Sequence, residues 1–159
     1  MILASASPVG MVFAFAAAAA YAVPAAAADR ISGQAIRVAL LAAWLLHAAT
    51  LAWGLLGDAP RFGFAPALSV TAWLVLTVYA VESRFFPQLR TRWALAALGG
   101  ATVLLALAFP GTPLHVAASP WLPMHWALGI ASYGLFAAAV VHAWLMRRAE
   151  KEIRLAAGH

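Results

Sequence analysis

The sequence contains no cysteine and little charge, and each absence excludes a class of protein. Without cysteine, disulfides, thiolate metal sites, iron–sulfur clusters and thioether attachment to this chain's own side chains are excluded. Charged residues make up only 9% of the 159 residues, whereas about 25% is usual for a soluble domain. Hydrophobic residues make up 65%, which excludes a soluble enzyme and a disordered tail. The sequence therefore predicts an integral membrane protein.

Five long apolar stretches are separated by short segments that contain helix breakers and charges. Each stretch is close to or above about 17 residues, the shortest length that crosses a bilayer as a helix. We expect an all-α, polytopic helix bundle of about five transmembrane helices, forming a single membrane domain over residues 1–159. The expected helices cover residues 8–28, 36–56, 65–81, 93–109 and 121–146, and a basic tail over 147–159 can extend the last helix. The first stretch could also be a signal peptide, but no Lys or Arg precedes it, which favours a retained helix.

Basic residues are distributed unequally between the two sides of these spans. If the N-terminus lies outside, the inner segments carry nine of the ten Lys and Arg residues, and the outer segments carry only Arg61. Cytoplasmic loops are enriched in Lys and Arg. We therefore expect an outer N-terminus, a cytoplasmic C-terminus and a multi-pass membrane protein. Its expected partner is the lipid bilayer, with the basic tail near an anionic leaflet, and no nucleic acid.

His47 lies near the middle of the second expected span, about ten residues or ~15 Å from either end. An ionisable side chain is costly at that depth, so His47 is a candidate for a functional site. The alternative is a neutral imidazole that hydrogen-bonds to a Ser, a Thr or a backbone carbonyl of a neighbouring helix. Depth alone does not choose between the two.

His125 lies at the outer mouth of the fifth expected span, between Trp121 and Trp126. Pro120 and Pro123 suit the start of a helix, where a missing N–H costs nothing. An imidazole between two indoles could receive a flat aromatic ligand. The alternative is an interfacial histidine within a belt of aromatic residues.

Haem is the ligand that fits imidazoles in apolar, aromatic surroundings, because imidazole is a common axial ligand of its iron. Two axial nitrogens of one iron lie within about 4 Å of each other. His47 and His125 differ in depth by about half a leaflet, so each would need another partner. Arg61, the lone outer cation, could neutralise a haem propionate, or it could be a loop residue without a ligand.

The remaining polar residues argue against other chemistry. None of the five carboxylates lies within a span, whereas an ion-coupled transporter would usually bury an acid. No hydrolase or transferase constellation and no nucleotide-binding motif is present. We therefore expect that the protein is not an enzyme, and we find no polar path for a small transporter.

The sequence resembles the cytochrome c assembly protein family of CcsA/CcmC-like membrane haem handlers, and in particular its HemX/YpjD-like branch. The segments that carry this resemblance are SPWLPMHW (119–126), ASYGLF (131–136), LHA (46–48), GF (63–64), ALS (67–69) and Trp73. The resemblance covers roughly residues 35–150. It implies that His125 is an outer-face haem ligand and that His47 is a membrane-embedded ligand of a different histidine pair. That branch usually has more spans, so the second ligands would lie in a missing part of the protein or in another subunit.

These observations give two hypotheses about function. In the first, the protein binds or guides haem b in the membrane for cytochrome c maturation. His125 and His47 would then be axial ligands of haem iron, Trp121 and Trp126 would wall the macrocycle, and Arg61 would hold a propionate. In the second, the protein is a cofactor-free membrane scaffold or assembly partner, and His47 is an interhelical hydrogen bonder.

Overall fold

The computed structural model describes residues 7–27, 30–57, 59–85, 92–113 and 121–157. In these ranges the chain forms five helices and two very short strands. They are α1 (Pro8–Ala26), α2 (Gly33–Leu56), β1 (Arg61–Phe62), α3 (Phe64–Phe85), α4 (Arg92–Ala108), β2 (Thr112–Pro113) and α5 (Leu122–Ala157). The all-α prediction is confirmed.

Four of the helices are long and apolar enough to cross a membrane, namely α1, α2, α3 and α5. The fourth helix in the chain, α4, has 17 residues, which is about 26 Å of helix against a hydrocarbon core of about 30 Å. The chain is thus a membrane helix bundle by length and composition. The fifth span and the orientation remain predictions.

Local sequence explains where the first two helices begin. The side chain of Ser7 accepts a hydrogen bond from the Gly10 backbone N–H (3.1 Å), and the first helical residue is a proline. Ser32 caps α2 in the same way through the Ala35 N–H (3.2 Å). Such caps satisfy backbone donors that the helix itself leaves without a partner. The expected start of the second span, residue 36, is therefore three residues later than the observed start.

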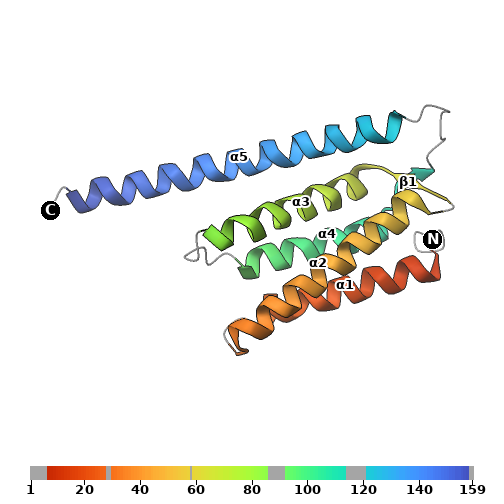
Figure 1. Cartoon of the computed structure of the whole chain (residues 1–159), viewed down its shortest axis with the longest axis horizontal. Helices are drawn as coiled ribbons and strands as arrows, with labels where there is room; N and C mark the ends of the chain where they lie inside the picture. The colour runs from red at the N-terminus through yellow and green to blue at the C-terminus, as the bar shows by residue number, and fades with distance from the viewer. Residues whose placement is uncertain (1–6, 28–29, 58, 86–91, 114–120, 158–159) are drawn as a thin grey trace.

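The first four helices lie side by side, with α1 against α2 and α4, and α3 against α4 (Figure 1). The core between them is built largely from alanines, which let helix backbones approach closely. Its buried members are Ala14, Ala17, Tyr21, Ala43, Leu76, Ala96 and Val103.

The last helix, α5, lies at the edge of this bundle and packs chiefly against α3. Its 36 residues make about 54 Å of helix, and its C-terminal half extends past the other helices (Figure 1). The expected basic tail is helical as far as Ala157 and continues α5.

The two strands tie the loop after α2 to the loop after α4. Arg61 pairs with Pro113 and Phe62 pairs with Thr112 in antiparallel register. Gly111, just before β2, has φ +79°, a conformation that favours glycine. This short tie fixes the backbone on which Arg61 is carried.

Candidate functional site

His47 lies inside the bundle with 0% of its surface exposed. Its Nδ1 is 3.1 Å from the Tyr21 hydroxyl of α1, and its Nε2 is 2.8 Å from the Ser69 hydroxyl of α3. The rings of His47 and Tyr21 meet edge to face, with centroids 5.7 Å apart. We call these three residues the buried polar node, and it joins α1, α2 and α3.

The pattern of donors within the buried polar node follows from the environment of Tyr21. Tyr21 is 1% exposed, and His47 is its hydrogen-bond partner among the described residues. The phenolic O–H of Tyr21 is a stronger hydrogen-bond donor than the aliphatic hydroxyl of Ser69, so we assign the Tyr21 O–H as the donor to Nδ1. A neutral imidazole then carries its hydrogen on Nε2, which donates to the Ser69 oxygen. Both ring nitrogens are therefore engaged.

The arrangement of His47 corresponds to the alternative in which a neutral imidazole is satisfied by neighbouring helices. An axial ligand needs a ring nitrogen that faces the iron, and in this packing neither nitrogen of His47 is open. His47 thus does not fit haem in this conformation. Its role as an axial ligand remains a prediction, and it would require that the buried polar node open.

The residues expected at the mouth of the fifth span lie at the start of α5. His125 and Trp121 are exposed, and the His125 ring makes no hydrogen bond to a residue that the structure describes. Trp126 stacks on Phe62 of β1, with centroids 6.2 Å apart and planes at 7°. Since Phe62 follows Arg61, the structure brings the aromatic side chain of Trp126 to the strand that carries the expected cation.

The Arg61 side chain is held in place by the adjoining loop. Its Nε (3.2 Å) and Nη2 (3.1 Å) both donate to the carbonyl oxygen of Gly111. A guanidinium has five N–H donors, so about three remain for other acceptors. The loop thus positions Arg61 while leaving part of its donor capacity free.

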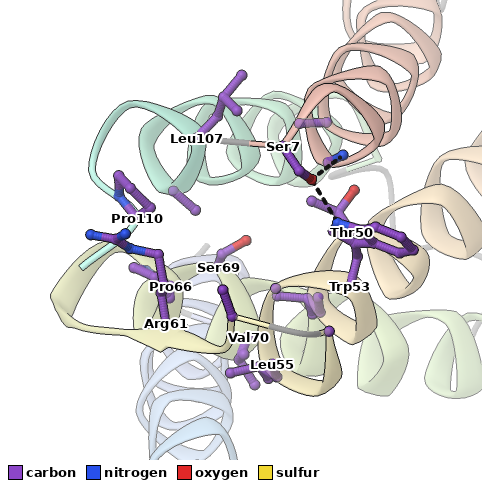
Figure 2. Close-up of a pocket in the computed structure, with 17 residues that line it drawn as sticks. Ser7, Thr50, Trp53, Leu55, Arg61, Pro66, Ser69, Val70, Leu107 and Pro110 are labelled. Carbon is purple, nitrogen blue, oxygen red and sulfur yellow. Dashed lines mark hydrogen bonds between the residues drawn. The ribbon is translucent and has the colours of Figure 1, made fainter. Parts of the chain in front are cut away.

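A cavity of about 250 Å³ opens among the ends of α1, α2, α3 and α4, beside the Arg61 strand. In Figure 2, Arg61 lies on one side of the cavity, and Ser7 and Trp53 lie on the opposite side. Ser69 also lines it, so the buried polar node reaches the cavity wall. Neither His47 nor His125 is among its described lining residues.

Sequence reasoning did not identify three residues that matter here, namely Tyr21, Ser69 and Phe62. Tyr21 is the one aromatic hydroxyl in the alanine-rich first stretch, and this isolation was the available signal. Ser69 was covered only by the general expectation of a Ser or Thr partner. Phe62 carried no signal, because its stacking depends on how α5 returns to β1.

No protein-family model, curated protein or solved structure matches this chain. Among the described residues there is also no group of three His, Asp or Glu side chains that could hold a metal ion.

Proposed function

We propose that this protein is a membrane haem handler of the cytochrome c assembly type that holds haem b where α5 begins. The observation that carries the proposal is that the exposed His125 precedes Trp126 in the chain, and that Trp126 stacks on Phe62, the neighbour of Arg61 in β1. The resemblance of residues 119–136 to that family supports the same site.

The residues at this end of the bundle suit the group. A histidine imidazole is a usual axial ligand of haem iron, and the stacked rings offer a flat apolar surface. The free N–H groups of Arg61 can donate to a propionate. Trp121, exposed one turn before His125, can cover a further edge. Haem is the cargo that is to be delivered, and the chain contributes binding and orientation without a covalent step.

Other parts of the proposal concern partners and location. Because His47 is engaged within the bundle, the second axial ligand comes from another subunit or from a part of the protein beyond these residues. The bilayer is that of the bacterial inner membrane, and the cargo serves cytochrome c maturation. The buried polar node then has a structural role and holds α1, α2 and α3 in register.

Absorbance of the purified protein tests this proposal. Protein purified from haem-replete cells is expected to show a Soret band that is lost in His125→Ala. His142→Ala, an exposed histidine farther along the same helix, is the matched control and should keep the band. Colourless wild-type protein, or an undiminished band in His125→Ala, would contradict the proposal.

A cofactor-free scaffold is the second candidate, and two observations favour it. Both nitrogens of His47 are satisfied inside the bundle. α5 packs chiefly on α3, whereas α1 packs on both α2 and α4, so α5 has more side-chain surface for a partner, including Phe136 and Trp144. A photo-crosslinking residue at position 136 should then form a discrete adduct with one partner polypeptide, while the same residue at position 15 on α1 should not. Under this hypothesis His125→Ala leaves the absorbance spectrum unchanged.

A further inference from the structure

The cavity at the end of the bundle has apolar walls and a small set of polar side chains. Its walls come from four helices, with residues such as Ala14, Leu51, Val70 and Leu107. The polar side chains among its described lining residues are Ser7, Thr50, Trp53, Arg61 and Ser69. Such a mixture of apolar surface with a few convergent polar groups is typical of ligand sites.

The two serines in the wall already accept hydrogen bonds and therefore have a hydroxyl hydrogen to donate. Ser7 Oγ accepts from Trp53 Nε1 (2.8 Å) and from the Gly10 N–H (3.1 Å). Ser69 Oγ accepts from His47 Nε2 (2.8 Å) in the tautomer assigned above, in which Tyr21 donates to Nδ1. Each hydroxyl has one hydrogen, and in both serines that hydrogen is not used in these bonds.

The remaining polar groups also favour an acceptor in the cavity. Arg61 has free N–H donors and is the one charged residue among the described lining residues. Thr50 donates its hydroxyl hydrogen to the Leu46 carbonyl, and Trp53 donates its indole N–H to Ser7. Neither side chain therefore has a donor left for a ligand. A cavity that offers donors and a positive charge matches a head group that only accepts, and an ionised carboxylate is such a group.

The cavity volume limits how large the occupant is. An apolar cavity of about 150 Å³ holds a benzene molecule, and drug-sized ligands occupy about 300–1,000 Å³. At about 250 Å³ the cavity has room for a carboxylate and the first part of one acyl chain. A phospholipid head group with its glycerol and two chains is considerably larger.

We propose that this cavity binds a free fatty acid, with the carboxylate at Arg61 and the acyl chain against the apolar walls. The cavity lies beside the haem site proposed at His125 and shares Arg61 with it, so fatty acid binding is measured on protein that is free of haem. The hydroxyls of Ser7 and Ser69 provide further donors to the carboxylate. Because Ser69 also belongs to the buried polar node, a bound fatty acid would contact that node through Ser69.

Fluorescence quenching by a brominated fatty acid tests the proposal on the full-length protein in neutral detergent micelles. Bromine quenches indoles that it contacts, and Trp53 lines the cavity. Dibromostearate is expected to give saturable quenching that is competed by oleate, and the quenched component should be absent in Trp53→Phe. Arg61→Gln should weaken binding about tenfold, which corresponds to about 1.4 kcal/mol.

Two controls separate specific binding from partition into micelles and from misfolding. Arg37→Gln removes the same charge from an exposed position near the start of α2 and should leave the affinity unchanged. Ala106→Leu fills the cavity while keeping Arg61, and it should also weaken binding about tenfold or more. Methyl dibromostearate lacks the charge and should bind at least tenfold more weakly than the acid.

Several outcomes would overturn the proposal. Quenching that rises without saturation, or equal affinity for the acid and its methyl ester, would mean that no carboxylate site exists. Equal affinity in wild type, Arg61→Gln and Ala106→Leu would place the fatty acid elsewhere. Tighter binding of brominated phosphatidylglycerol than of dibromostearate would assign the cavity to a phospholipid. Each of these results leaves the absorbance test at His125 unaffected.

Discussion

The substitution His47→Ala tests whether the buried polar node holds the bundle together. The imidazole is fully buried and bonds to Tyr21 at 3.1 Å and to Ser69 at 2.8 Å. Its removal leaves two buried hydroxyls without their partner and a void between α1, α2 and α3. We therefore expect the variant to fold with a lower free energy of unfolding.

The magnitude follows from the hydrogen bonds and the void. Interhelical hydrogen bonds in membrane proteins contribute on average about 0.6 kcal/mol and at most about 1.7 kcal/mol each. Large-to-small substitutions of buried side chains cost about 2–5 kcal/mol through lost contacts and the cavity. We expect His47→Ala to lose about 2–4 kcal/mol. Tyr21→Phe keeps the ring and loses only its bond to His47, so we expect about 0.6–1.7 kcal/mol.

Reversible unfolding in mixed micelles measures these differences, with SDS titrated into dodecyl maltoside and helix content followed by circular dichroism. Leu45→Ala is the matched control, because Leu45 lies on the same helix and is 53% exposed. The double variant of His47→Ala and Tyr21→Phe completes a thermodynamic cycle. Because the two residues touch, we expect a coupling of about 0.5 kcal/mol or more.

Two results would refute this reasoning. If His47→Ala is no less stable than Leu45→Ala, the imidazole contributes nothing to the bundle. If the His47→Ala and Tyr21→Phe effects simply add, the bond between them has no energetic role. A Soret band that appears or strengthens in Tyr21→Phe would instead favour His47 as a haem ligand that is released when its partner is lost.

Two further predictions concern glycines. Gly99→Ala should destabilise the bundle by about 1–3 kcal/mol in the same assay, because the added Cβ would lie 2.8 Å from Tyr21 Cζ. Gly129→Ala is the control and should be neutral or stabilising, because its added Cβ meets nothing within 4 Å. Equal effects of the two substitutions would contradict the observed packing around Gly99. Gly111→Ala should loosen the β1–β2 tie, because the added Cβ would overlap the Phe62 carbonyl and φ is +79°. Hydrogen exchange at Phe62 should rise while α2 stays protected, and unchanged exchange would show that the tie tolerates a side chain.

The predicted helices agree with the observed ones where the length of an apolar stretch determines the extent of the helix. The expected spans 8–28, 36–56 and 65–81 match α1, α2 and most of α3, because burial in a bilayer requires long apolar helices whatever their neighbours are. The helix starts depend on capping by Ser7 and Ser32, and these local signals were not used to set the expected boundaries. The length of α5 beyond residue 146 agrees with the expectation that the basic tail can extend the last helix.

The candidate site was predicted only in part. The depth of His47 identified it as an unusual residue, yet depth could not show whether its nitrogens were free. Its partners lie 26 residues earlier and 22 residues later in the chain, and nothing local links them to it. Likewise, Arg61 was expected as an outer cation, but its bonds to Gly111 span 50 residues and depend on the β1–β2 pairing.

The sequence by itself determined that this chain is an all-α protein suited to a bilayer, because that property depends on the length and composition of single helices. Tertiary structure alone decided that the His47 ring is satisfied by Tyr21 and Ser69, that Trp126 reaches Phe62, and that the ends of four helices enclose a donor-lined cavity. These features depend on which faces of different helices meet. The packing that selects those faces comes from small side chains such as Ala14, Ala43 and Gly99, whose effect appears only when the helices are together.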